Sequence, residues 1–105
     1  MRFHIIAQSH AGERFRRIEV DGERVAFPQY KTETFAAHAN PMAKTTGEPA
    51  YVVSHVGTGM RLSGGKTQAA AISTARQLIA EKSTEEFWRA IAAARQYIKA
   101  IQTLA

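Results

Sequence analysis

Cysteine is absent from this sequence of 105 residues. Its absence excludes disulfide bonds, zinc sites built on thiolates and a cysteine nucleophile. Long apolar runs are absent as well, since charged and polar residues interrupt the N-terminal stretch MRFHIIAQSH. We therefore expect neither a signal peptide nor a membrane-spanning helix, and we expect a cytoplasmic protein with no membrane partner. The length is typical of one domain, which we expect to span residues 1–105.

The sequence contains little that is typical of a catalytic site. Its four histidines stand in separate segments, and none forms an HExxH motif or another pair of metal ligands four residues apart. Ser9-His10 and Ser54-His55 are neighbours in the sequence, but neighbours on a strand point to opposite faces of the sheet. No two acidic residues are placed as a general acid and a general base. We therefore predict a protein that is not an enzyme and that holds no metal ion or cofactor.

The segment between Tyr51 and Gly65 contains the clearest strand pattern of the chain. β-Branched and aromatic residues alternate from Tyr51 to Val56, a Gly-Thr-Gly turn follows, and the alternation resumes at Met60. A period of two residues is typical of strands, and glycine tolerates the backbone angles of a tight turn. The segment therefore predicts a β-hairpin over 50–63.

A helix is predicted directly after this hairpin. Apolar residues recur at helical spacing from Ala69 to Ala80, and Thr67 is placed to accept a hydrogen bond from the first turn. The run Gly64-Gly65-Lys66-Thr67 is similar to part of a phosphate-binding loop, which requires another glycine five positions before its Gly-Lys pair. That position holds Met60. We therefore interpret the run as a flexible joint between strand and helix.

A second hairpin is predicted around Asp21-Gly22. This dipeptide stands between two alternating apolar runs, a pattern that favours a two-residue turn of type I′. The turn would pair Ile18 with Val25 and, with a first strand over 3–7, would complete an N-terminal meander. The apolar residues that would share one face of this hairpin are Ile18, Val20, Val25 and Phe27.

Residues 32–40 fit two different structures. A short helix could begin at a Thr32 or Thr34 cap and end at Asn40, with Pro41 beyond it. A strand through Thr34 and Phe35 is the alternative. The sequence leaves this choice open.

The C-terminal segment predicts a long helix. Ser83 and Glu86 form a capping box at its start. The apolar residues that follow at alternating spacings of four and three are Phe87, Ile91, Ala94, Ile98 and Ile101. We call them the apolar seam. The seam could cover the sheet of its own chain, or it could pair with a second copy in a homodimer through residues 84–104.

Together these elements predict an α+β fold. An antiparallel β-sheet, made from the N-terminal meander and the 50–63 hairpin, is packed on one face by two C-terminal α-helices.

The segment 51–82 resembles two kinds of nucleic-acid-associated protein. Its strand, glycine turn, Lys66-Thr67 and alanine-rich helix are similar to the last strand and helix of double-stranded RNA-binding domains. The helix start also resembles that of HicB-type antitoxins. Double-stranded RNA-binding domains have a helix before their sheet, where this chain has strands, and a Lys-Lys pair at the joint. We therefore assign no family and transfer no functional residue.

Charge is the strongest indication of function. The chain has 14 Lys and Arg residues and 9 Asp and Glu residues, a formal net charge of +5, which favours anionic partners. On the C-terminal helix, Trp88, Arg95 and Lys99 fall on the flank beside the apolar seam. Basic groups beside an aromatic ring suit phosphate contacts and base stacking. The alternative interpretation is structural, with Trp88 covering the edge of the core and the basic side chains lying over it.

We predict a small accessory protein that binds nucleic acid and is not catalytic. The residues predicted to contact nucleic acid are Arg14, Arg16, Arg17, Arg61, Lys66, Trp88, Arg95 and Lys99. The alternative is a protein–protein interaction module, such as an inhibitor or adaptor of the kind that phage and plasmid genes encode. Such a module would bind through the apolar seam or through a sheet edge.

Overall fold

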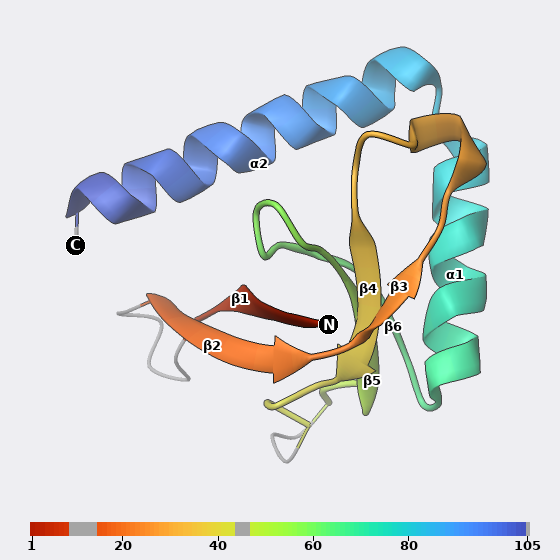
Figure 1. Ribbon diagram of the computed structural model, residues 1–105, viewed down its shortest axis with the longest axis horizontal. Coiled ribbons are helices and arrows are strands. Elements are labelled where there is room, and N and C mark those ends of the chain that lie inside the picture. Colours follow the sequence, from red (N-terminus) through yellow and green to blue (C-terminus); the bar gives the residue numbers. More distant parts are fainter. Residues whose placement is uncertain (9–14, 44–46, 105) are drawn as a thin grey trace.

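The computed structural model describes residues 1–8, 15–43 and 47–104, and these residues form three layers (Figure 1). A two-stranded ribbon lies on one side of a central sheet and the first helix lies on the other, while the C-terminal helix runs from the first helix across the end of the sheet toward the ribbon. In chain order the elements are β1 (Arg2–Gln8), β2 (Phe15–Asp21), β3 (Glu23–Val25), the 3₁₀ helix η1 (Pro28–Tyr30), β4 (Phe35–Ala39), β5 (Tyr51–His55), β6 (Arg61–Gly65), α1 (Gln68–Glu81) and α2 (Thr84–Leu104). The predicted α+β fold is confirmed.

The central sheet is antiparallel, with the strand order β3-β4-β5-β6. The predicted hairpin over 50–63 is confirmed, since Val53 of β5 pairs with Ser63 of β6. Alternation along β4 and β5 divides the side chains between two cores. Phe35 and Val53 belong to the core shared with the helices. Ala36 belongs to a second core, under the ribbon.

Helix α1 lies close to the sheet because small residues form its inner face. Ala71 and Ala75 are fully buried in the core shared with the sheet. At the joint, a Cβ on Gly65 would lie 2.6 Å from the backbone nitrogen of Ala71, so only glycine fits there. The predicted cap is confirmed, because Thr67 Oγ1 accepts a hydrogen bond of 3.1 Å from the backbone N–H of Ala70.

The hairpin predicted at Asp21-Gly22 is wrong. Strand β2 pairs with β1, with Ile18 opposite Ile5, and β3 pairs with β4 in the other sheet. No residue other than glycine has a positive φ in the described ranges, and Gly22 does not have one either, so a type I′ turn is not formed here. The chain instead stays extended and crosses from one sheet to the other at Gly22, whose absent side chain leaves room for the carbonyl oxygen of Ala37.

This crossing separates the apolar residues that were expected on one face. The residues of β2 pack in the core under the ribbon, and those of 25–27 pack in the core shared with the helices. The N-terminal strands therefore form a separate ribbon, and the single meander sheet expected from the sequence is not present.

Residues 35–39 form a strand, which settles the choice left open for 32–40. Phe35, Ala36, Ala37 and His38 are all buried, because β4 is an inner strand with the ribbon on one side and α1 on the other. A strand buried on both faces has no alternation of polar and apolar residues, so its sequence is similar to that of a short helix.

Helix α2 begins at the predicted capping box. Ser83 Oγ accepts a hydrogen bond of 3.1 Å from the backbone N–H of Glu86. The first half of the apolar seam is buried in the core: Phe87 stacks on Tyr30 with ring centroids 3.5 Å apart, and Ile91 lies beside it. The two helices thus share one core, as predicted. No helix in the described ranges is both long and apolar enough to traverse a bilayer.

Candidate functional site

A groove separates the outer half of α2 from the β1–β2 ribbon. It encloses about 240 Å³. Ile98 contributes from α2, and Arg17 contributes from β2, on the opposite wall. The remaining residues that line it are Phe3, His4, Ile6, Val56, Gly57 and Thr58. We call this hollow the ribbon–helix groove.

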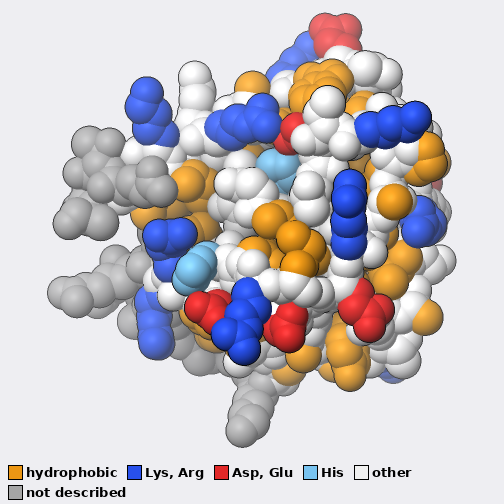
Figure 2. All heavy atoms as spheres, in the orientation of Figure 1, with side chains coloured by type: hydrophobic (Ala, Val, Ile, Leu, Met, Phe, Trp, Pro, Cys, Tyr) orange, Lys and Arg blue, Asp and Glu red, His pale blue; other side chains and the backbone are white. Residues whose placement is uncertain are grey.

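Basic side chains stand on both sides of this groove. Figure 2 shows Lys and Arg side chains gathered over α2 and over β2 on one face of the molecule. Arg17 is exposed on the ribbon, while Arg95 and Lys99 are exposed on α2, on either side of Ile98 in the sequence. On the same face of the ribbon Glu19 lies 3.9 Å from Arg2, so these two charges offset each other.

Trp88 and Arg95 share one flank of α2, as their spacing predicts. The Trp88 ring meets Tyr30 edge to face, with centroids 5.9 Å apart, and Arg95 donates to Glu33 three residues further along the chain. Trp88 covers the core edge, which agrees with the structural interpretation, yet 38% of its surface stays exposed. The Trp88 ring can therefore cover the edge of the core and still offer a surface for base stacking.

The structure does not bring all the predicted basic residues together. Arg16 is exposed, but it neighbours Arg17 on a strand and so points to the opposite face of the ribbon. Arg61 begins β6 and pairs with Glu48 at 2.9 Å, away from the groove. Lys66 follows the last residue of β6, at the far end of that strand. Arg14 lies outside the described residues.

Arg95 is hydrogen-bonded to a network that continues into the buried side chains of His55 and Thr58. Glu33 Oε1 lies 2.7 Å from Arg95 Nη2 and 2.9 Å from His55 Nε2. The other ring nitrogen of His55, Nδ1, lies 2.8 Å from Thr58 Oγ1, which also accepts from the backbone N–H of Met60. Burial lowers the pKa of His55, and the charge of Arg95 acts in the same direction, while Glu33 opposes them. The neutral ring thus donates from Nε2 and accepts at Nδ1.

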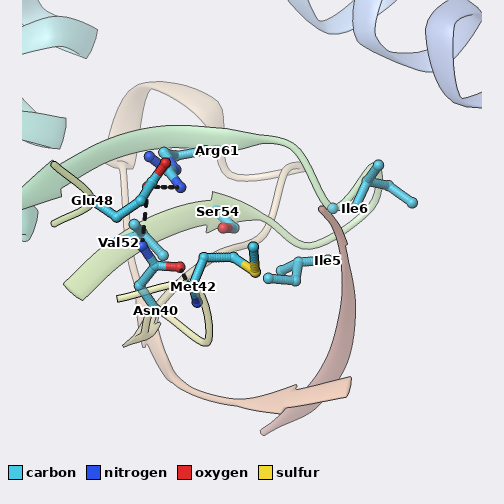
Figure 3. Close-up of a pocket in the computed structure, with 9 residues that line it drawn as sticks. Ile5, Ile6, Asn40, Met42, Glu48, Val52, Ser54 and Arg61 are labelled. Atoms are coloured by element: carbon cyan, nitrogen blue, oxygen red, sulfur yellow. Dashed lines mark hydrogen bonds and ion pairs between the residues drawn. The ribbon is translucent and has the colours of Figure 1, made fainter. Parts of the chain in front are cut away.

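A second hollow lies over β5 and β6 on the ribbon side of the sheet (Figure 3). It encloses about 320 Å³. We call it the Ser54 pocket. Its lining residues are Ile5, Ile6, Asn40, Met42, Glu48, Val52, Ser54, Gly59 and Arg61. The rim is held by hydrogen bonds, because Asn40 Nδ2 donates to Glu48 Oε2 at 3.3 Å and to the Pro49 carbonyl at 2.9 Å.

Ser54 is hydrogen-bonded to a histidine of the neighbouring strand. Its Oγ lies 2.9 Å from His38 Nε2, and His38 Nδ1 lies 2.8 Å from the carbonyl oxygen of Ala39. Burial lowers the pKa of His38, the bond to Ala39 opposes this, and the charge of Arg61 adds to the lowering. The neutral ring therefore donates from Nδ1 to the carbonyl, and it accepts the hydroxyl proton of Ser54 at Nε2.

This pair is not apparent in the sequence, because His38 and Ser54 belong to different strands and stand 16 residues apart. Ser54 and His55 do point apart, and each finds its partner elsewhere. In the β4–β5 register Ser54 lies opposite Ala36, so His38 stands two residues along the same face. The pair could have been found only after 35–39 had been recognised as a strand.

Comparisons with family models, with curated proteins and with solved structures find no match to this chain. Within the described ranges, no group of three or more His, Cys, Asp or Glu side chains could hold a metal ion. The arrangement of the groove and of the Ser54 pocket is therefore what bears on function.

Proposed function

We propose that this protein binds single-stranded nucleic acid along the ribbon–helix groove. One observation carries the proposal: Arg17 and Ile98, which belong to opposite ends of the chain, line the same groove. Arg17 thereby brings a cation of the ribbon to a groove whose other wall belongs to α2, the helix that also carries the exposed Arg95 and Lys99. The net charge of +5 strengthens the attraction for a polyanion.

The groove offers the two kinds of contact that a single strand requires. Arg17, Arg95 and Lys99 supply cations to the phosphates, and the fixed planar guanidinium groups suit phosphate oxygens. The apolar side chains of Ile6 and Ile98 supply surfaces for unstacked bases. The half-exposed ring of Trp88 extends this surface along α2 and offers a face for base stacking. A duplex buries its base faces and could not use these apolar contacts.

Glu33 contributes by holding Arg95 in place. The Glu33 side chain is only 8% exposed, whereas the Arg95 side chain is 56% exposed. Of the guanidinium nitrogens of Arg95, Nη2 is the one that donates to Glu33. A guanidinium group has five N–H donors, so those not directed at Glu33 remain for a phosphate. An orientation fixed in advance reduces the entropy lost on binding.

Fluorescence anisotropy with labelled single-stranded DNA, duplex DNA and RNA tests the proposal, at about 50 and about 200 mM salt. We expect saturable binding to the single strands that weakens by more than tenfold at the higher salt. An absence of binding at the lower salt overturns the proposal.

Two matched double variants distinguish binding in the groove from attraction to the total charge of the protein. Arg17→Gln with Lys99→Gln removes two charges beside the groove, and Arg16→Gln with Lys66→Gln removes two charges elsewhere. We expect the first pair to lower affinity at least tenfold and to reduce the salt slope by about 2, near 1 for each phosphate contact. The second pair should change affinity less than threefold. Equal losses would show that binding follows total charge and not the groove.

The second candidate function is self-association through the outer half of α2. Ala94, Ile98 and Ile101 continue the apolar seam beyond the core and are only half-buried, a feature that favours pairing with a second copy. Sedimentation velocity distinguishes the two functions. A dimer that Ile98→Glu converts into a folded monomer, together with no binding to nucleic acid, supports the interaction module.

A further inference from the structure

Two pairs of histidine and hydroxyl side chains lie on opposite sides of β5. His55 and Thr58 face the helices, and His38 and Ser54 face the ribbon. All four side chains are buried. The pairs look alike in composition, but their remaining hydrogen bonds differ.

The pair of His55 and Thr58 has no capacity left for chemistry. Thr58 Oγ1 gives its proton to His55 and accepts the backbone N–H of Met60, while His55 gives its own proton to Glu33. These bonds close the turn between β5 and β6 and attach it to Glu33. The pair has a structural role.

The pair of Ser54 and His38 has the arrangement of a nucleophile and its base. A nucleophilic hydroxyl requires a base within hydrogen-bond reach, and that base must be oriented by a third group. Here the Ala39 carbonyl holds Nδ1–H, which leaves Nε2 directed at Ser54 Oγ, 2.9 Å away. Among the described residues, the bond to His38 is the one hydrogen bond that Ser54 Oγ makes.

The surroundings of Ser54 include a cation and an empty volume. Arg61 lies directly opposite Ser54 across β5 and β6, so the two side chains share a face and line the same pocket. Arg61 gives one N–H to Glu48 and has other donors for a ligand. Figure 3 shows Ser54 and Arg61 around the hollow, with Ile5, Met42 and Val52 forming apolar walls. A volume of about 320 Å³ accommodates a small ligand.

We propose that Ser54 is the nucleophile of an acyl-transfer site that hydrolyses carboxylic esters of small aliphatic acids. This inference is independent of nucleic-acid binding, and it departs from the non-catalytic protein expected from the sequence. His38 is the general base, Arg61 stabilises the oxyanion, and the apolar walls hold the acyl chain.

The reaction proceeds in two balanced steps. Ser54 Oγ attacks the ester carbonyl carbon while His38 Nε2 takes the hydroxyl proton, and the resulting oxyanion faces Arg61. The bond from carbon to the alcohol oxygen then breaks, and His38 returns the proton to the departing alcohol. Water then attacks the acyl carbon while His38 Nε2 takes its proton, the bond from that carbon to Ser54 Oγ breaks, and His38 returns the proton to Ser54 Oγ. The products are a carboxylic acid and an alcohol, and Ser54 is regenerated.

An alkyl fluorophosphonate, followed by intact mass and peptide mapping, tests whether Ser54 is reactive. We expect one adduct per chain, located at Ser54 and abolished by Ser54→Ala. Ser63 provides the control, because this buried serine of β6 donates to the Ala71 carbonyl and has no histidine partner among the residues that the structure describes. Ser63→Ala should label as the unsubstituted protein does. No adduct after prolonged exposure, or an adduct on another residue, overturns the proposal.

A second measurement uses the absence of cysteine in the chain. Ser54→Cys and Ser63→Cys each introduce a single thiol at a buried position, and iodoacetamide measures its reactivity. With His38 as a base, Ser54→Cys should react at least tenfold faster than Ser63→Cys near neutral pH. Adding His38→Gln to Ser54→Cys should remove this difference. Equal rates for the two single variants would show that the pocket does not activate the group at position 54.

Discussion

Glu33 and Arg95 stand 62 positions apart in the chain, yet Glu33 Oε1 and Arg95 Nη2 lie 2.7 Å apart. The same carboxylate oxygen lies 2.9 Å from His55 Nε2. One acidic residue thus joins the segment before β4, the end of β5 and the outer half of α2. Because Glu33 is nearly buried, its charge is screened little by solvent and acts strongly on both partners.

This junction predicts opposite effects on the pKa of His55. Burial is the largest cause of the lowered pKa of His55. Glu33 opposes that lowering, and the charge of Arg95 adds to it. Arg95→Gln should therefore raise the pKa of His55, and Glu33→Gln should lower it further. Titration of the histidine ring signals by NMR measures both. The ring nitrogens of His38 bond to Ala39 and Ser54 instead of to Glu33 or Arg95, so the titration of His38 is the internal control. Shifts of His55 in the same direction in the two variants would contradict the assigned network.

The two buried histidines predict that stability depends on pH. Burial lowers the pKa of His38 and of His55 below the ordinary value of 6.5. The unfolded chain therefore binds more protons than the folded one as the pH falls below that value. The stability that the neutral rings contribute is fully present above pH 6.5, and it is lost as the pH falls toward the pKa values of the folded protein.

Urea unfolding at about pH 7.5 and about pH 5.5 measures this loss, above the range in which most carboxylates titrate. The free energy of unfolding should be lower at the acidic pH. Equal stability at the two pH values would mean that the buried rings are not held neutral.

The features that the sequence predicted are those set by local interactions. The Thr67 cap, the Ser83 capping box and the 50–63 hairpin each depend on residues that are close in the chain. In each case hydrogen bonding or alternation within one segment is sufficient to specify the geometry.

The features that it missed depend on pairing between distant segments. Asp21-Gly22 has the composition of a turn, but β1 competes for β2 and β4 competes for β3, so the chain remains extended. The same limit hid the pair of Ser54 and His38, which exists only through the β4–β5 register. The ribbon–helix groove was also out of reach, since Arg17 and Ile98 meet only in the folded molecule.

Replacing isoleucine by alanine should lower the free energy of unfolding by different amounts at the two ends of the apolar seam. Ile91 is buried in the core, whereas Ile101 is half-buried near the end of the helix. Ile91→Ala should lower the free energy of unfolding by about 2 to 5 kcal/mol, the range for a buried isoleucine. Ile101→Ala should cost less than about 1 kcal/mol, nearer to a surface substitution. Urea unfolding measures both, and similar costs would mean that a partner covers the outer seam.

Adding a side chain at Gly59 should destabilise the contact between β1 and the turn after β5. Its carbonyl accepts the backbone N–H of Ile6 at 3.1 Å, its φ is 75°, and an added Cβ would lie 2.8 Å from the His4 carbonyl oxygen. Gly47 is the matched control, since its φ is 85° but an added Cβ meets no atom within 4 Å in the described part of the chain. Gly47→Ala should cost about 1 to 2 kcal/mol from backbone strain alone. Gly59→Ala should cost a further 1 to 3 kcal/mol or so, because β1 must move away. Equal losses of stability in urea would show that β1 does not press against this turn.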